Sequence, residues 1–160
     1  MKPRPARLRV YTDTSVIGGC HNRQFAADSL RLIELARLDH VRILLSAVVI
    51  KELEKAPPAV QSVLAGLPET AIEIVPITAE VVSLRDAYLK AGIVRPRWTD
   101  DATHVAAASV ARADAIVSWN FKHIVHLGKI RWYNQINRGL GYHDLTIVTP
   151  SMVTHETKKD

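Results

Sequence analysis

Residues 8–13 read LRVYTD, and this short run decides how the rest of the chain is interpreted. Its first five residues alternate apolar and polar types and are rich in β-forming residues, which predicts a strand. Asp13 follows, and Thr14 and Ser15 after it are types that favour helix caps and turns. The sequence therefore predicts a buried strand that carries an aspartate at its carboxyl end.

Similar apolar stretches recur along the chain and alternate with amphipathic segments. We expect strands at 43–45, 72–77, 115–118 and 145–148, and helices at 27–38, 47–55, 60–67, 78–92, 99–113, 121–125 and 129–138. Ser46, Thr78 and either Thr99 or Asp100 are expected helix caps, and Pro150 closes the last strand. The alternation predicts an α/β protein: a three-layer α/β/α sandwich around a central parallel sheet. In such sheets, ligands bind outside the carboxyl ends of the strands.

The length and composition suit one globular domain. The chain has 160 residues, of which 48% are hydrophobic and 23% charged, which excludes a wholly disordered protein. No apolar stretch approaches the ~18 residues of a membrane span. The single cysteine, Cys20, forms no internal disulfide and favours a reducing, cytoplasmic location. We expect a flexible basic leader at 1–7 with no signal-peptide character, one domain at 8–155, and a tail at 156–160.

The net charge is +5, and the sequence pI is about 9.6, which favours an anionic partner such as nucleic acid. Residues 1–9 carry four basic residues and no acidic one. Residues 85–138 carry nine basic and four acidic residues. The predicted domain therefore combines a nearly neutral body with a local basic excess.

Polar residues follow the predicted strands where a site is expected. Asp13 follows the first strand, Glu52 lies in the helix after the second, Asp101 opens the alanine-rich helix, and Asn120 follows the strand at 115–118. Each also has a purely structural interpretation: Asp13 as a helix cap, Glu52 as a solvated helix residue, and Asn120 as a turn residue.

Helical spacing separates neighbouring acids from one another. Glu52 lies four residues after Val48 and borders the apolar side of its helix, whereas Glu54 is expected to face water. Asp101 precedes Val105 by one turn, so it lies on the packed face, and Asp100 is the better cap. A carboxylate that borders a core needs a partner, and a metal ion is one candidate.

Clustered carboxylates match the chemistry of a metal-dependent phosphodiesterase. Mg²⁺ and Mn²⁺ take hard oxygen ligands, usually one or two carboxylates with water and substrate phosphate. The cation offsets the repulsion between the carboxylates, generates a hydroxide nucleophile and stabilises charge on a phosphoryl group. Nearby basic residues would position a polyanion.

Four segments together resemble the PIN-domain family. They are residues 11–19 (YTDTSVIGG), 46–52 (SAVVIKE), 101–108 (DATHVAAA) and 115–124 (AIVSWNFKHI), and the ending 136–150 resembles a bacterial subgroup. The resemblance implies a flavodoxin-like α/β/α fold and a Mg²⁺- or Mn²⁺-dependent nuclease, usually acting on RNA. Many bacterial members are VapC-like toxins restrained by a cognate antitoxin, and homodimers are common.

The resemblance carries residue roles to this chain by position. Asp13, Glu52 and Asp101 match the three acidic residues, and Ser15 matches a polar residue near the metal. Asn120 stands where most members have a fourth aspartate, which leaves open both the binding of a second metal and a member that binds without cutting. The expected metal ligands are Asp13 and Asp101. Glu52 is expected to orient or deprotonate the attacking water, with a water shell tuned by Ser15, Ser118 and Asn120.

Other residues receive weaker assignments. The candidate phosphate contacts are Arg95, Arg97 and Lys122, followed by Lys129, Arg131 and Arg138. We expect His104 to form an interhelical hydrogen bond, His123 to be structural, Trp119 to pack, and Cys20 to have no catalytic role.

Two alternatives to a nuclease stay open. A haloacid-dehalogenase-like phosphatase also places an aspartate after its first strand, but it needs a second aspartate where this chain has Ser15. A non-catalytic PIN-fold module that only recognises RNA or protein is the other. Metal-dependent cleavage of a mixed RNA pool distinguishes this module from the nuclease.

Overall fold

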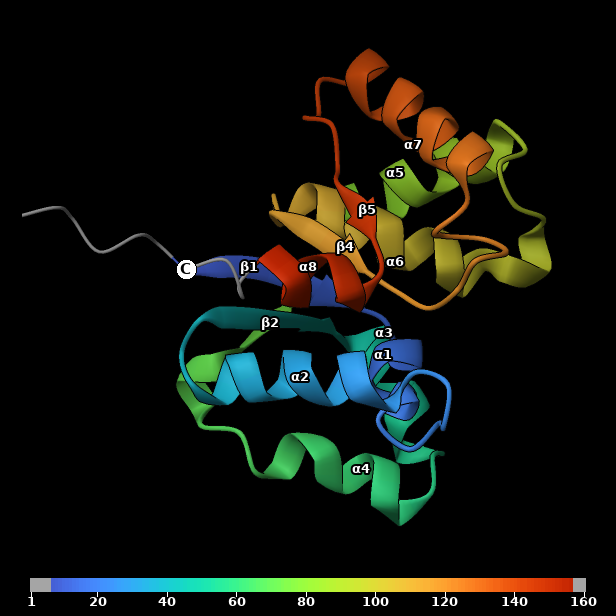
Figure 1. The fold of residues 1–160 in the computed structure, drawn as a ribbon. Coiled ribbons are helices and arrows are strands. Elements are labelled where there is room, and N and C mark those ends of the chain that lie inside the picture. The colour runs from blue at the N-terminus through green and yellow to red at the C-terminus, as the bar shows by residue number, and fades with distance from the viewer. Residues whose placement is uncertain (1–6, 157–160) are drawn as a thin grey trace, which may run out of the picture.

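The computed structural model describes residues 7–156, which fold around a five-stranded, wholly parallel sheet of order β3-β2-β1-β4-β5 (Figure 1). The strands are β1 (Leu8–Thr12), β2 (Val41–Ser46), β3 (Ile72–Val75), β4 (Ala115–Val117) and β5 (Ile147–Val148). The predicted parallel α/β sheet is thus confirmed. β1 lies at its centre, with Val10 paired to Ile43 on one side and to Ala115 on the other.

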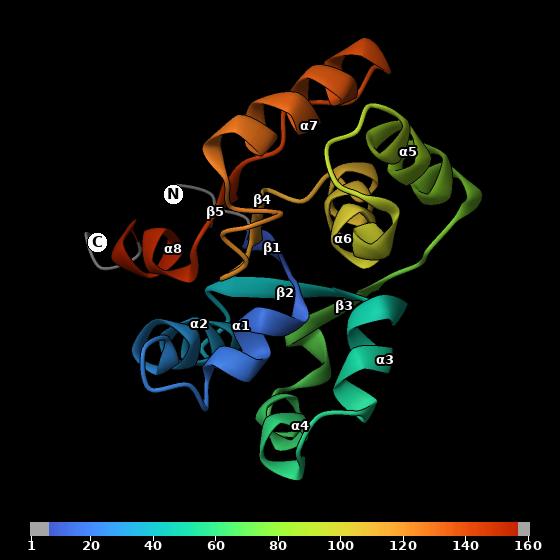
Figure 2. The same cartoon turned by 90° about the vertical axis from the view of Figure 1, so that its right-hand side faces the viewer.

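Helices cover both faces of this sheet. They are α1 (Thr14–Gly19), α2 (Ala26–Arg37), α3 (Ala47–Glu54), α4 (Pro58–Ala65), α5 (Ala79–Lys90), α6 (Thr99–Val110), α7 (Leu127–Gly139) and α8 (Pro150–Glu156), with short 3₁₀ turns at Glu69–Ala71 and Pro96–Trp98. Helices α5, α6 and α7 lie on one side, and α1, α2, α4 and α8 on the other (Figures 1 and 2). Within residues 7–156, no helix is long and apolar enough to cross a bilayer.

Helix α6 is the most deeply buried helix. Every residue from Ala102 to Ser109 is buried, because small alanine side chains let the helix pack closely between the sheet and α5. One consequence is that a polar residue within this stretch, such as His104, must find its partners inside the protein. The burial of α6 therefore fixes the first turn of this helix against the carboxyl edge of the sheet.

Two helices and one turn differ from the sequence-based expectations. Helices α1 and α8 were not predicted, because α1 is short and contains β-branched residues and glycines, and Pro150 begins a helix as well as ending a strand. Residues 121–125 form a turn instead of the expected helix. The Asn120 side chain accepts the backbone N–H groups of Lys122 and His123, which closes a turn and ends helical propagation.

Helix caps differ in their details. The Thr78 hydroxyl caps α5 by accepting from Val81 N at 3.3 Å, as expected. Ser46 occupies the N-cap position of α3 but makes no capping bond, since its hydroxyl contacts Tyr11 instead. The prediction that Thr99 or Asp100 caps α6 is wrong: Trp98 holds that position, and both residues lie in the first turn.

Candidate active site

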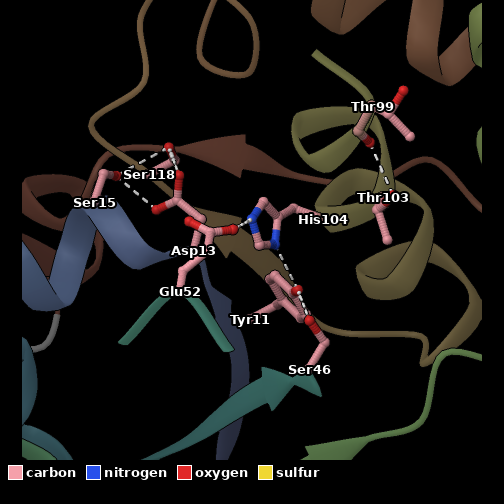
Figure 3. Close-up of polar contacts among 9 residues, drawn as sticks. All are labelled: Tyr11, Asp13, Ser15, Ser46, Glu52, Thr99, Thr103, His104 and Ser118. Carbon is pink, nitrogen blue, oxygen red and sulfur yellow. Dashed lines mark hydrogen bonds and ion pairs between the residues drawn. The ribbon is translucent and has the colours of Figure 1, made fainter. Parts of the chain in front are cut away.

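Asp13 lies at the carboxyl end of β1, only 4% exposed, and is fixed by two hydroxyls. Its Oδ1 accepts from Ser15 Oγ at 2.6 Å, and its Oδ2 accepts from Ser118 Oγ at 2.7 Å (Figure 3). Ser118 directly follows β4, which pairs with β1, so sheet pairing brings it to Asp13. Asp13 sits at the N-cap position of α1 without capping it. Its carboxylate is therefore available to the site.

Both serine hydroxyls are oriented by the backbone. Ser15 Oγ accepts from Trp119 N at 2.9 Å, and Ser118 Oγ accepts from Asn120 N at 2.9 Å. With an N–H directed at each oxygen, both hydroxyl protons point to Asp13. These serines, expected to tune the water shell, thus hold the carboxylate in one orientation.

Glu52 meets His104 between α3 and α6. Its Oε1 lies 3.3 Å from Nε2 of His104, which is the interhelical contact expected for that histidine. The His104 Nδ1 lies 2.8 Å from the Tyr11 hydroxyl, which lies 2.7 Å from Ser46 Oγ (Figure 3). A continuous polar chain therefore runs from the buried end of β2 to Glu52. The sequence indicated neither Tyr11 nor Ser46 as part of the site; the one available signal is that His104 follows Asp101 by one helical turn.

The exposure of Glu52 matches its predicted position. The Glu52 side chain is 37% exposed, whereas Glu54 on the same helix is an exposed residue. The hydrogen bond from His104 lowers the pKa of Glu52, against a smaller opposing effect of burial. Glu52 is therefore ionised at neutral pH and reaches solvent.

The carboxylates share one electrostatic environment. Burial raises the pKa of Asp13, although His104 and the two serine hydroxyls oppose the rise. Burial also raises the pKa of Asp101, with smaller contributions from the charges of Asp13 and Glu52. Burial lowers the pKa of His104, but Glu52, Asp13 and Asp101 together raise it above its ordinary value. The charge of each predicted acid therefore acts on His104, and Glu52 also contacts this histidine directly.

Asn120 contributes a donor to this group. Its Oδ1 accepts from His123 N at 2.9 Å and from Lys122 N at 3.2 Å, so both acceptor positions of that oxygen are used. The amide NH₂ is left for Asp101, and this hydrogen bond lowers the pKa of Asp101. At the position where the resemblance implies a fourth carboxylate, this chain has an amide that donates to Asp101.

Two adjoining pockets open at this edge. An acidic pocket of about 420 Å³ is lined by Glu52, Arg97, Trp98, Asp100, Asp101, Asn120, Lys122 and His123. A basic pocket of about 390 Å³ is lined by Gly92, Ile93, Val94, Arg95, Arg97, Trp98, Lys122, His123 and Lys129. Of the predicted phosphate contacts, Arg97 and Lys122 line both pockets and Arg95 lines the second. Lys129, a further predicted phosphate contact, also lines the second pocket, and Trp98 lines both pockets without a specific sequence signal.

The remaining candidates lie outside the pockets. Trp119 stacks on Phe25 with ring centroids 4.4 Å apart, as expected for a packing residue. Arg138 pairs with exposed Asp144 at 2.9 Å, and Arg131 is exposed on α7. Burial raises the pKa of the Cys20 thiol to about 11, so Cys20 stays protonated and is a poor nucleophile.

The oxygen donors suit a hard divalent cation. Mg²⁺ in proteins usually takes one or two carboxylates and completes its shell with water and phosphate. Asp13 and Asp101 supply two carboxylates whose charges burial disfavours, and a cation would relieve that cost. Within the described part of the chain, no three His, Cys, Asp or Glu side chains are grouped closely enough to form a metal cage. Asp13 and Asp101 are the two carboxylates that would hold such a cation.

No family model and no curated protein matches the sequence. Solved structures do match in fold. The VapBC2 structure from Rickettsia felis, bound to a DNA fragment from its promoter, has 20% identity, covers 72% of this chain and 90% of its own, and gives a TM-score of 0.52. Mycobacterium tuberculosis VapC20, described as a sarcin-ricin loop cleaving toxin, has 16% identity, covers 71% and 92%, and gives 0.53. This chain therefore has the three-layer α/β/α PIN-domain fold of VapC toxin structures.

Proposed function

We propose that this protein is a Mg²⁺- or Mn²⁺-dependent endoribonuclease. One observation carries the proposal: the buried Asp13 carboxylate, held by two serine hydroxyls, shares its electrostatic environment with Asp101 and Glu52 at the carboxyl edge of the sheet. This edge is where parallel α/β sheets bind ligands. The VapC-like fold supports the same activity.

Different residues of the chain would have different roles in the reaction. Asp13 and Asp101 would hold the cation, which when bound compensates phosphoryl charge and acidifies water. Ser15 and Ser118 keep Asp13 in a single orientation, so little reorganisation is needed on binding. Glu52, ionised through its contact with His104, would orient the attacking water and accept its proton. Arg97 and Lys122 would hold the RNA backbone beside the acids.

The biological role that we propose is the toxin of a type II toxin–antitoxin pair in the cytoplasm. Support comes from the likeness in fold to the VapBC2 structure, which is bound to a DNA fragment from its promoter. A homodimer is part of this proposal. Co-expression with the product of a small adjacent reading frame should suppress RNA cleavage, and light scattering of the purified chain should give twice the 17.8 kDa mass.

Cleavage of a mixed RNA pool tests the activity. Wild-type protein should cut RNA in Mg²⁺ or Mn²⁺ and stop in EDTA. Asp13→Asn should lower the rate roughly 10³-fold, because a metal interaction is worth several kcal/mol. Asp86→Asn, an exposed change on α5, should leave the rate unchanged. Full activity of a folded Asp13→Asn protein would rule out the assignment.

The orientation of Asn120 favours one second candidate, a module that binds RNA without cutting it. Its Oδ1 is used by the backbone, so this position supplies neither a fourth carboxylate nor a free amide oxygen. RNA binding in both metals without any cleavage would support this candidate over the nuclease.

A further inference from the structure

The basic pocket is built from three separate parts of the chain. The segment after α5 contributes Arg95 and Arg97, the turn after β4 contributes Lys122 and His123, and the first turn of α7 contributes Lys129. The pocket shares four lining residues with the acidic pocket: Arg97, Trp98, Lys122 and His123. The two pockets are therefore continuous, with one wall in common.

His123 lies in this common wall, and its contact with Lys129 defines which ring nitrogen carries the proton. It is only 6% exposed, and its Nδ1 lies 3.1 Å from the Lys129 ammonium. An ammonium has no lone pair to accept with, so Nδ1 must accept and the ring proton is on Nε2. Among the described residues, Nε2 has no hydrogen-bond partner. His123 therefore holds a buried N–H donor without a partner, in a side chain that belongs to the lining of both pockets.

Positive charge accumulates around this donor without compensation. Arg97 and Lys122 lie 5.0 Å and 5.5 Å from the ring centre of Trp98, which packs on His123 with centroids 4.6 Å apart. In the part of the chain that the structure describes, neither of them, nor Lys129, has a carboxylate within 4.0 Å. Lys129 also occupies the first turn of α7, where the helix dipole disfavours a cation.

The pKa shifts of His123 and Lys129 agree with this geometry. Burial and then the Lys129 charge lower the pKa of His123, so its imidazole is neutral at physiological pH. Burial and the Lys122 charge likewise lower the pKa of Lys129. These groups repel one another in the free protein, and a bound anion would remove that repulsion.

We propose that the basic pocket is a phosphate subsite, in which Lys129, Arg97 and Lys122 supply the charge and the neutral His123 donates its Nε2–H. The inference rests on the proposed nuclease function, and the ligand that it names is a phosphodiester adjacent to the one that is cut. Continuity with the acidic pocket favours an RNA backbone over a separate ligand. The donors come from three separate segments of the chain.

The subsite acts on RNA binding, which can be measured without cleavage. In EDTA, fluorescence anisotropy with a labelled single-stranded RNA that lacks terminal phosphates would be followed over a range of salt concentrations. Lys129→Gln should weaken binding about tenfold, the value of one charge-assisted hydrogen bond. It should also reduce the slope of log affinity against log salt by roughly 0.7, the contribution of one phosphate contact on a single strand. Lys55→Gln, an exposed change outside both pockets, should alter neither quantity.

His123 provides a second, sharper test. Because its imidazole is neutral, His123→Gln should weaken RNA binding several-fold, within the range of a lost hydrogen bond, and leave the salt slope unchanged. A slope that falls as it does for Lys129→Gln would overturn the neutral-donor assignment. In a parallel NMR titration of wild-type protein, inorganic phosphate should shift the His123 ring nitrogens. Its binding should be weaker than that of RNA, since free phosphate engages this subsite alone.

Failure of this inference differs from failure of the proposed function. Equal RNA affinity of Lys129→Gln and Lys55→Gln would overturn the subsite even if the wild-type protein cleaves RNA. Lys129-dependent binding of a glutamate-rich peptide, with unchanged RNA binding, would overturn it in favour of a protein partner. An inactive protein whose RNA binding in EDTA depends on Lys129 would retain the subsite and exclude the nuclease.

Discussion

The acidic and basic pockets share a wall, but their charged groups differ in the contacts that they make within the protein. In the acidic pocket, Glu52 contacts His104, and a hydrogen bond from Asn120 lowers the pKa of Asp101. Asp13, which is not among the residues that line this pocket, is held by two serine hydroxyls. Across the wall, Lys122 and Lys129 have no carboxylate partner among the described residues. The protein therefore orients its acids through hydrogen bonds and an ion pair, whereas Lys122 and Lys129 have no such carboxylate contact among the described residues.

This difference follows from what each pocket would bind. A small divalent cation needs oxygens at fixed positions, so hydrogen bonds that orient the carboxylates lower the cost of assembling the site. A nucleic-acid backbone is held chiefly by charge, which flexible lysine and arginine side chains provide without fixed geometry. The acidic side should consequently be sensitive to small changes and the basic side tolerant of them.

The largest effect should come from a carboxylate itself. Asp101→Asn removes a predicted metal ligand and should lower RNA cleavage roughly 10³-fold, as the loss of a metal interaction worth several kcal/mol. The neighbouring Asp100→Asn is a matched comparison: Asp100 lines the same pocket but is exposed and is not a predicted metal ligand, so the loss of rate should be much smaller. Equal rate losses in the two variants would mean that the pocket works through total charge and not through placed ligands.

His104 connects the acids to the core, so replacing it should destabilise the protein. His104→Gln disrupts buried contacts to Tyr11 and Glu52 and should lower the free energy of unfolding by about 1–3 kcal/mol, measured with urea. His40→Gln, an exposed change before β2, is the control. An unchanged urea midpoint for His104→Gln would show that this polar chain does not stabilise the acidic side.

Two adjacent glycines of α1, Gly18 and Gly19, allow a test of how closely this helix packs against Ser29 and Trp119. A Cβ at Gly19 would lie 2.6 Å from Ser29 Oγ and 2.9 Å from Trp119 Nε1, atoms that are themselves hydrogen-bonded at 2.8 Å. Gly19→Ala should cost about 1–3 kcal/mol of folding stability.

The neighbouring position is the matched control for this packing test. At Gly18 a Cβ meets nothing within 4 Å, so Gly18→Ala should gain roughly 0.5–1 kcal/mol, because alanine loses less conformational freedom in a helix. Thermal unfolding of both variants distinguishes them, and equal melting temperatures would contradict the close approach at Gly19.

The smallest effect is a pH dependence of stability. Burial raises the pKa of Asp101 in the folded state, so the folded protein binds this proton more tightly than the unfolded chain does. Its ionisation therefore costs stability above the folded pKa, and that cost disappears as the pH falls through it. In EDTA at neutral pH, Asp101→Asn should be more stable than wild type. The difference should shrink as the pH is lowered, and a difference that grows toward acid would contradict the shift.

Much of the fold could be predicted from local pattern. Alternating strands and helices indicated a parallel α/β/α architecture, and helical spacing correctly separated half-buried Glu52 from exposed Glu54. The errors fall where local pattern is weakest. Helix α1 is too short for a periodic signal, and the turn at 121–125 depends on a side chain that bonds to the backbone ahead of it.

The sequence by itself determined the periodicity of the elements and the placing of acids at strand ends, because both depend on near neighbours. Tertiary structure alone decided the strand order β3-β2-β1-β4-β5 and the contact of His104 with Glu52. It also brought the Lys129 ammonium within hydrogen-bond distance of His123 Nδ1, six residues away along the chain. Such contacts depend on which elements pack together, and that choice is made by burial over the whole core.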